Sequence, residues 1–162
     1  MKIQLSILIS LFILLTGCGK QKANDDLQAL FGGGCFWNLD YYLTKIKGVK
    51  ECQCVYSNSG SEAVLVTYDP KVISFDELCE VFFSIHDPKV NYKQQYRSLI
   101  QVNDPERFNT AQKMISALGV PTKVEKLGTL KTPESFNEDW YANKNSIPRC
   151  SNNMEKIKIF FK

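Results

Sequence analysis

The chain has 162 residues, which is enough for one domain with a single hydrophobic core. Its composition is that of an ordinary globular protein, with 44% hydrophobic and 23% charged residues, and it has no internal repeat or low-complexity tract. The formal net charge of +3 is small and the lysines are scattered along the chain, so nothing in the sequence suggests a nucleic-acid partner.

The first eighteen residues differ from the rest of the chain. Lys2 precedes a nearly continuous apolar run from Ile3 to Leu15, which is short for a membrane span and typical of the apolar part of a signal peptide. The run closes in the sequence Leu-Thr-Gly-Cys at residues 15–18, which resembles the lipobox of bacterial lipoproteins. The alternative is a simple secretory signal followed by a chance cysteine.

The lipobox resemblance implies cleavage before Cys18 and acylation of its sulfur and its new amino group. Because several acyl chains hold a protein on a bilayer, we expect Cys18 to be a lipid anchor in the bacterial cell envelope. Gly19 is not the aspartate linked to inner-membrane retention, which favours the periplasmic side of the outer membrane in a bacterium with two membranes. We therefore expect a signal peptide over 1–17, a lipidated cysteine and polar tether over 18–28, and a single domain over 29–162.

Past the tether, the hydrophobic pattern alternates between strands and helices. It predicts a strand over 29–31, a helix over 36–45, strands over 49–56 and 63–68, a helix after Ser74, a strand over 98–102, a helix over 105–118 and a strand over 122–130. This order predicts an α+β fold, namely a two-layer, ferredoxin-like sandwich with a mostly antiparallel mixed sheet. The segment from Pro133 onward has no clear period, so we expect an irregular C-terminal tail.

Capping signals mark the second and third helices. Ser74 is followed three residues later by Glu77, which is the pattern of a capping box. Asp104 precedes Pro105 at the first helical position, and Gly119 follows the last turn. These residues predict where both helices begin and where the third one ends.

Five cysteines follow the expected anchor, namely Cys35, Cys52, Cys54, Cys79 and Cys150. An odd number in an exported protein argues against a fully paired structural framework. Cys52 and Cys54 alternate along a strand and so face one side, where they are either small buried side chains or a redox relay. They are a weak metal signal, and we expect no metal site. Cys79, in the middle of a helix, is expected in the core.

The most informative segment is the glycine-rich turn over 32–34, which is followed by Cys35. A strand that passes through this turn into a helix places Cys35 at or just before the first helical turn. Backbone N–H groups there have no intrahelical partner, and the helix dipole favours a thiolate, so we predict a reactive thiol with a low pKa. The alternatives are an inert buried cysteine and an anion cradle, although the Lys and Ser/Thr of a phosphate loop are missing.

Gly34-Cys35-Phe36-Trp37 is the first of five segments that belong together. The others are Glu62 to Pro70, Val72 to Pro88, Gln95 to Ser98, and Tyr141 to Asn145 before Cys150. In this order, from about Ala29 to Cys150, they resemble the A-type peptide methionine sulfoxide reductases. The cysteine signature is specific by itself, and the other segments are specific as a set.

This resemblance implies that the thiolate of Cys35 attacks the sulfoxide sulfur while Glu62 protonates the oxygen. A carboxylic acid donates a proton near neutral pH only when burial raises its pKa, so we expect Glu62 beside an aromatic pocket. Tyr96 would donate a hydrogen bond to the sulfoxide oxygen as its negative charge grows. Phe36 and Trp37 would form an apolar wall for the S-methyl group.

Attack leaves a sulfenic acid on Cys35, which a second thiol condenses to a disulfide. The resemblance implies that Cys150 is this resolving cysteine and that a thioredoxin-like partner reduces the disulfide. It thus implies the reduction of methionine S-sulfoxide, free or in proteins, without a cofactor. We expect a monomer.

The chain departs from the family in the loops around this site. Only 57–61 separate the strand end at Tyr56 from Glu62, and Tyr56 matches an earlier tyrosine, so the family's second oxygen-binding tyrosine has no counterpart. The loop before Tyr96 is also short and lacks the family's pocket aspartate, and Asn38 stands where glycine is usual. We expect a shallow, wet pocket, with slow turnover or a preference for surface-exposed sites in proteins.

Two other functions stay open at this point. The shortened loops suit a redox sensor or binding module for oxidised proteins, which would keep its partners without Cys35. His86, the only histidine, would pair with Cys35 in a cysteine hydrolase, although a histidine at a helix end more often caps the last carbonyl groups. Lys93 and Arg97, close to Tyr96, either steer an acidic partner or are solvated.

Overall fold

The computed structural model describes residues 27–137, 139–148 and 158–161. The expected signal peptide, the expected anchor Cys18 and the expected resolving cysteine Cys150 lie outside these ranges. Among the helices of the described ranges, none combines the length and the apolar character needed to cross a membrane.

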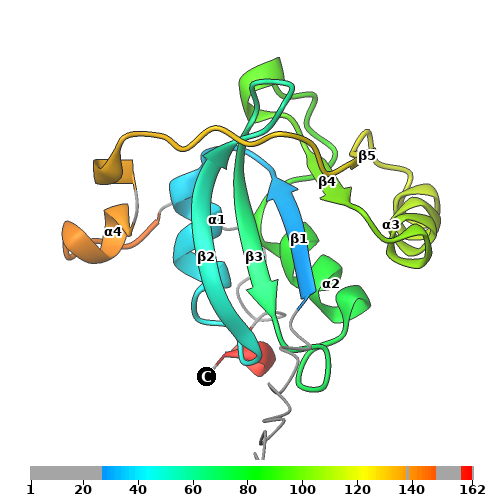
Figure 1. The fold of residues 1–162 in the computed structure, drawn as a ribbon, viewed down its shortest axis with the longest axis horizontal. Coiled ribbons are helices and arrows are strands. Elements are labelled where there is room, and N and C mark those ends of the chain that lie inside the picture. Colours follow the sequence, from blue (N-terminus) through cyan, green and yellow to red (C-terminus); the bar gives the residue numbers. More distant parts are fainter. Residues whose placement is uncertain (1–26, 138, 149–157, 162) are drawn as a thin grey trace, which may run out of the picture.

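Five strands form one sheet, in the order β2-β3-β1-β4-β5 (Figure 1). The elements are β1 (Leu27–Gly32), α1 (Phe36–Leu43), β2 (Val49–Tyr56), β3 (Glu62–Tyr68), α2 (Phe75–Ile85), the 3₁₀ turn η1 (Gln94–Tyr96), β4 (Leu99–Val102), α3 (Pro105–Leu118), β5 (Lys123–Lys126), η2 (Ser135–Asn137), α4 (Trp140–Asn143) and η3 (Lys158–Phe160). Neighbouring strands are antiparallel except β4 and β5, which are parallel. Two interleaved βαβ units give the first four strands their order, which confirms the ferredoxin-like sandwich.

The capping signals mark the helix ends correctly. The Ser74 hydroxyl accepts a hydrogen bond from the Glu77 N–H, and the Glu77 carboxylate accepts one from the Ser74 N–H at 2.8 Å. The Asp104 carboxylate accepts a hydrogen bond from the Arg107 N–H at 2.8 Å. Gly119 has a φ of 62° and closes α3 in the left-handed conformation that glycine adopts without strain.

The last strand is shorter than the sequence predicts. A strand over 122–130 was expected, but β5 ends at Lys126, because its only neighbour β4 ends opposite it at Val102. The chain then leaves the ladder and crosses the sheet (Figure 1). At Lys131 it pairs with Tyr56 through two backbone hydrogen bonds of 2.8 and 3.0 Å. The C-terminal segment is thereby placed beside the end of β2.

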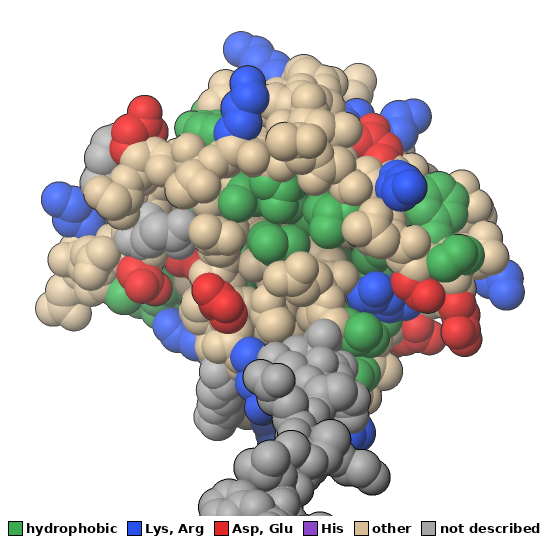
Figure 2. Space-filling model, in the orientation of Figure 1, with side chains coloured by type: hydrophobic (Ala, Val, Ile, Leu, Met, Phe, Trp, Pro, Cys, Tyr) green, Lys and Arg blue, Asp and Glu red, His purple; other side chains and the backbone are tan. Residues whose placement is uncertain are grey.

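The two faces of the sheet carry different clusters. One face holds the main core, which packs against α1 and α2 and includes Phe31, Val64, Val66 and Ile100 from the strands with Leu39, Leu78 and Phe82 from the helices. The opposite face holds a smaller cluster of Leu30, Val55, Ala63 and Leu99, against which Leu65, Leu127 and Leu130 pack. Figure 2 shows hydrophobic side chains gathered at the centre of this second face. Strand alternation places successive residues on opposite faces, and the site described below uses it.

Candidate active site

Cys35 lies where the sequence predicts, at the junction of β1 and α1. It is the N-cap residue of α1, with extended backbone, and follows Gly34, whose φ of 77° suits glycine. The Gly34 N–H donates a hydrogen bond of 2.9 Å to the Tyr96 carbonyl, which ties the turn to η1. A Cβ on Gly33 would lie 2.9 Å from the ring of His86, so only glycine fits there.

Glu62 is the first residue of β3 and lies beside Cys35, although 27 positions separate them in the chain. Its side chain is nearly buried, with 6% exposure. One carboxylate oxygen accepts a hydrogen bond from the Phe36 N–H at 3.2 Å, and the other accepts one from the Gln95 amide at 2.9 Å. The carboxyl group is therefore held between the start of α1 and the η1 turn.

The thiol of Cys35 differs from the prediction of a low pKa. Burial, with the adjacent negative charge of Glu62 and a hydrogen bond to it, raises the pKa from an ordinary 9.0 to about 11. The backbone N–H groups of Trp37 and Asn38 act in the opposite direction but are outweighed. The prediction of a low pKa was wrong, because the sequence pattern did not reveal that the sulfur is partly buried beside a carboxylate.

Two phenols face this pair. The charge of Glu62 is the first cause that raises the pKa of Tyr96, followed by burial and by Cys35. Burial and then the charge of Glu62 raise the pKa of Tyr56, to which Tyr96 and Cys35 also contribute. Both hydroxyls thus stay protonated donors at neutral pH. Tyr56 lies opposite Glu62 in the β2–β3 register and so belongs to the candidate site, although the sequence comparison did not match it to the family's second oxygen-binding tyrosine.

The two aromatic residues after Cys35 have different environments. Phe36 is 2% exposed and belongs to the main core, where its ring lies 5.7 Å from that of Tyr56. Trp37 is partly exposed, and its ring lies 6.4 Å from that of Phe36. Its other ring contact is Trp140 of the C-terminal segment, at 4.0 Å between centroids and 5° between planes. Phe36 thus lies beneath the candidate site as part of the core, whereas Trp37 lies at the edge of the site and is partly exposed.

The C-terminal segment borders the side of the site where the loop is short. Lys131 pairs with Tyr56, and the Asn137 side chain accepts a hydrogen bond of 3.1 Å from the Trp37 indole N–H. Trp140 covers one face of Trp37. The expected open side is therefore partly walled by residues that follow β5, a contact that no local sequence signal predicts.

His86 is the C-cap residue of α2 and is buried. Its Nδ1 lies 2.9 Å from the Phe82 carbonyl oxygen and its Nε2 lies 2.8 Å from the Ser98 hydroxyl. Since a carbonyl only accepts, Nδ1 carries the proton and Nε2 accepts from Ser98. Burial lowers the pKa of His86 to about 4. Both nitrogens are thus engaged away from Cys35, which confirms the helix-cap interpretation and contradicts the Cys35–His86 dyad.

The other cysteines of the described ranges lie in the main core. Cys54 is buried and Cys52 partly buried on the helix-facing side of β2, the common side that the sequence predicts. Cys79 is a buried, free thiol in α2, and burial raises its pKa well above the usual range. Among the residues that the structure describes, no cluster of three or more His, Cys, Asp or Glu side chains has the arrangement of a metal site.

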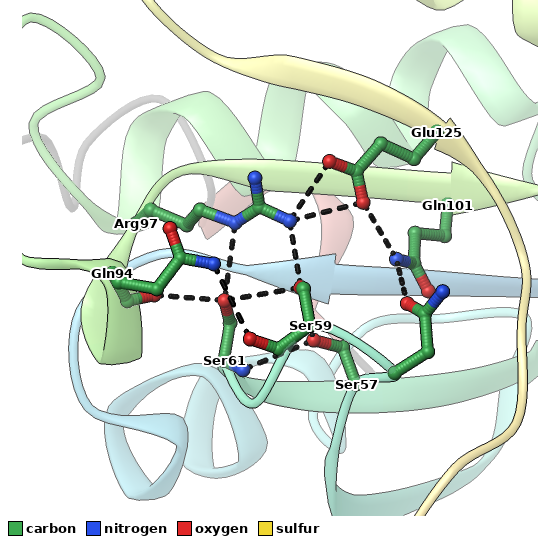
Figure 3. A network of polar contacts seen from close by, with 8 residues as sticks. Ser57, Ser59, Ser61, Gln94, Arg97, Gln101 and Glu125 are labelled. Carbon is green, nitrogen blue, oxygen red and sulfur yellow. Dashed lines mark hydrogen bonds and ion pairs between the residues drawn. The ribbon is translucent and has the colours of Figure 1, made fainter.

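The sequence left open that Arg97 is solvated, and this interpretation was wrong. Its side chain is 18% exposed, and its guanidinium contacts Ser59, Ser61 and Glu125 (Figure 3). Asn38, in place of the usual glycine, is buried with its amide 3.5 Å from the Ile85 carbonyl oxygen at the end of α2.

The sequence is similar to known reductases. The sequence profile of the peptide methionine sulfoxide reductase family matches residues 27–62 and 58–161. Over 150 residues, the chain is 33% identical to the peptide methionine sulfoxide reductase MsrA of Nautilia profundicola, an alignment that covers 76% of this chain and 87% of that protein. These matches favour an enzyme over the binding-module alternative.

The fold is also similar to solved structures. Methionine sulfoxide reductase A of Corynebacterium diphtheriae superposes with a TM-score of 0.66 at 21% identity, covering 76% of this chain and 77% of that one. Mxr1 from Saccharomyces cerevisiae, in a complex with Trx2, gives a TM-score of 0.56 at 22% identity, covering 75% and 90%. At this level of identity the superpositions support the fold.

Proposed function

Since this chain belongs to the peptide methionine sulfoxide reductase family and is a peptide-methionine (S)-S-oxide reductase, we propose that Cys35 attacks the sulfoxide sulfur. In this proposal Glu62 accepts the proton of the Cys35 thiol and then donates it to the sulfoxide oxygen. The observation that carries these roles is the contact between the two side chains at the start of α1. A thiol with a pKa of about 11 is almost fully protonated at pH 7, so attack requires a base close by. Glu62 is that base.

The proton that leaves Cys35 is then used to protonate the sulfoxide oxygen. Transfer to Glu62 gives a thiolate and a carboxylic acid side by side. The Cys35 sulfur bonds to the sulfoxide sulfur while the carboxylic acid returns the proton to the oxygen. The hydroxyl group then moves from the methionine sulfur to the Cys35 sulfur, so that the S–O bond of the substrate and the new S–S bond both break. The products are methionine, which is reduced, and a Cys35 sulfenic acid, which is oxidised and carries the oxygen and the proton.

In this proposal, Tyr96 and Tyr56 bind the oxygen during this step. Their hydroxyls stay protonated, and both respond to the charges of Glu62 and Cys35. Donors that face a developing negative charge stabilise it more than they stabilise the neutral substrate. Phe36 and Trp37 supply the apolar surface for the S-methyl group.

Cys150 is the resolving thiol in this proposal. Its attack on the sulfenic acid forms a Cys35–Cys150 disulfide and releases water, and a thioredoxin-like dithiol then reduces the disulfide. The family segment before Cys150 supports this role, and the yeast complex of Mxr1 with Trx2 supports the class of reductant. Cys52 is the control, because it is a partly exposed thiol outside the proposed pair.

We further propose that Cys18 anchors the reductase to an envelope membrane, where it repairs exported proteins. The support is the apolar run over 3–15 and the Leu-Thr-Gly-Cys sequence that ends it. Expression with labelled palmitate tests this, since Cys18→Ser is expected to abolish labelling and release the protein from the membrane fraction. Labelling that persists in this variant contradicts the anchor.

Turnover of a dabsylated methionine S-sulfoxide by the full chain in detergent, with dithiothreitol, tests the catalytic roles. Cys35→Ser is expected to abolish turnover, and Glu62→Gln to slow it by about 100-fold. In a single turnover without dithiothreitol, Cys150→Ser is expected to reduce one equivalent of substrate and to accumulate the sulfenic acid, which dimedone traps, whereas Cys52→Ser should behave like wild type. Full turnover in Cys35→Ser contradicts the assignment of Cys35 as the nucleophile.

A further inference from the structure

Two catalytic residues of the proposed mechanism have chain neighbours that bond to each other. Glu62 follows Ser61, and Tyr96 precedes Arg97. The Arg97 Nε–H donates a hydrogen bond of 3.1 Å to the Ser61 hydroxyl. Because successive residues of an extended chain point to opposite sides, Ser61 points to the face of the sheet opposite the one that Glu62 faces.

The bond belongs to a larger cluster, which we call the Arg97 network (Figure 3). Its members are Ser57, Asn58, Ser59, Ser61, Gln94, Arg97, Gln101 and Glu125. Three segments contribute to it: the turn before β3, the η1 turn with β4, and β5. The first two carry Glu62 and Tyr96, and the third is a strand of the sheet.

The short turn before Glu62 is tied to itself. The Ser57 N–H donates to the Ser61 carbonyl at 2.8 Å, and the Ser61 N–H donates to the Ser57 hydroxyl at 3.1 Å. Gly60 has a φ of 77°, which lets the chain reverse in this short span. Such a turn has a defined shape, but these bonds do not fix its position relative to η1.

Contacts from outside the turn fix that position. The Ser61 hydroxyl donates to the Gln94 carbonyl at 2.8 Å, and the Gln94 amide donates to the Ser59 carbonyl at 3.3 Å. Arg97 then joins the turn to the sheet, because its Nη2 lies 2.7 Å from the Ser59 hydroxyl and 2.8 Å from a Glu125 oxygen. Gln101 holds Glu125 with a further hydrogen bond of 3.0 Å.

We propose that Arg97 is a positioning residue for sulfoxide reduction, which holds the turn that carries Glu62 against the segment that carries Tyr96. It touches neither the thiol nor the substrate. Its planar guanidinium donates in two directions at once, and a lysine at this position keeps the charge opposite Glu125 but loses the second direction. The proposal rests on the catalytic roles of Glu62 and Tyr96.

Arg97→Lys in the full chain tests the proposal, and Arg107→Lys is its matched control. Arg107 is similarly covered, with 16% exposure, and it contacts Asp104, the Gln28 carbonyl and the Tyr68 hydroxyl away from the catalytic groups. Since a displacement of about 1 Å at reacting groups costs up to 100-fold in rate, we expect Arg97→Lys to lower kcat about ten-fold and to change KM less than two-fold. Arg107→Lys should lower Tm but leave kcat within two-fold.

A double-mutant cycle separates positioning from general destabilisation. Ser61→Ala removes the Nε partner of Arg97, so it should lower kcat in the same direction, and the double variant Arg97→Lys/Ser61→Ala should be no slower than the slower single variant. If Arg97→Lys does not fold, Ser61→Ala and Ser59→Ala carry the test with the same expected loss. A kcat unchanged in Arg97→Lys, or in both serine variants, overturns the proposal, and so does an equal loss in Arg107→Lys. Turnover that survives Cys35→Ser instead refutes the proposed function.

Discussion

The indole of Trp37 stacks on the indole of Trp140, with centroids 4.0 Å apart and planes 5° from parallel. Trp37 belongs to the start of α1, two residues after Cys35, and Trp140 begins α4 in the C-terminal segment. A second pair, Tyr41 and Tyr141, meets edge to face at 5.8 Å one helical turn further along α1. The C-terminal segment is thus held on α1 by aromatic contacts beside the Cys35 thiol, where the nearby loop is short.

Trp140→Ala is expected to loosen this segment. An aromatic pair contributes about 0.5–1.5 kcal/mol beyond the area it buries, and Lys144 also loses the ring over which its ammonium lies at 5.1 Å. A local opening that is easier by about 1.4 kcal/mol makes tryptic cleavage after Lys144 about ten-fold faster. Mass spectrometry of the fragments measures this rate. Leu118→Ala, at an exposed site on α3, is the control, and equal cleavage rates in all three proteins contradict the expectation.

Alkylation of Cys35 by iodoacetamide should accelerate with pH well beyond pH 9. The cause is the raised pKa of about 11, and Glu62→Gln should move the midpoint down only partway, because burial is the larger cause. The raised pKa of Cys35 also makes the folding stability depend on pH. A thiol whose pKa is higher in the folded chain than in the unfolded one stabilises fully below pH 9 and loses that contribution as the pH rises to about 11. A midpoint of alkylation below pH 8, with the label located on Cys35, contradicts this picture.

Tyr56→Phe should lower kcat by about ten-fold, because it removes one hydrogen-bond donor near the developing oxyanion and keeps the ring packed on Phe36. Tyr56→Phe/Tyr96→Phe should be slower than either single variant. Steady-state kinetics with a dabsylated methionine S-sulfoxide measure both. Tyr41→Phe, on α1, is the control for loss of a phenol hydroxyl. If the kcat of Tyr56→Phe equals that of wild type, Tyr56 does not donate a hydrogen bond to the sulfoxide oxygen.

The unfolding free energy should fall as the pH drops from about 6.5 toward 4. His86 has its pKa lowered to about 4 by burial, so the unfolded chain binds the proton first, and its contribution is complete above pH 6.5 and lost below about pH 4. The slope from this group is at most about 1.4 kcal/mol per pH unit. Urea unfolding of wild type and His86→Gln between pH 4 and 7 isolates it. Folded His86→Gln should retain sulfoxide turnover, because both ring nitrogens bond away from Cys35, and a loss of turnover in the folded variant contradicts that expectation.

Local sequence signals determined most of the fold of this protein. The capping pairs of Ser74 and Asp104 act over three residues, so their effect can be read from the chain without knowing what packs nearby. The glycines before Cys35 likewise place it at the start of α1. The ferredoxin-like order of strands follows from the alternation of elements.

Tertiary structure alone decided the chemistry of the site. The pKa of Cys35 depends on Glu62, and the position of Glu62 depends on Gln95 and on the bond between Ser61 and Arg97. These partners come from segments tens of residues apart, and desolvation acts through space rather than along the chain. The position of Trp140 is also decided by tertiary structure. Because β4 ends at Val102, the residues after Lys126 have no strand to pair with, and the chain crosses the sheet and brings Trp140 against Trp37.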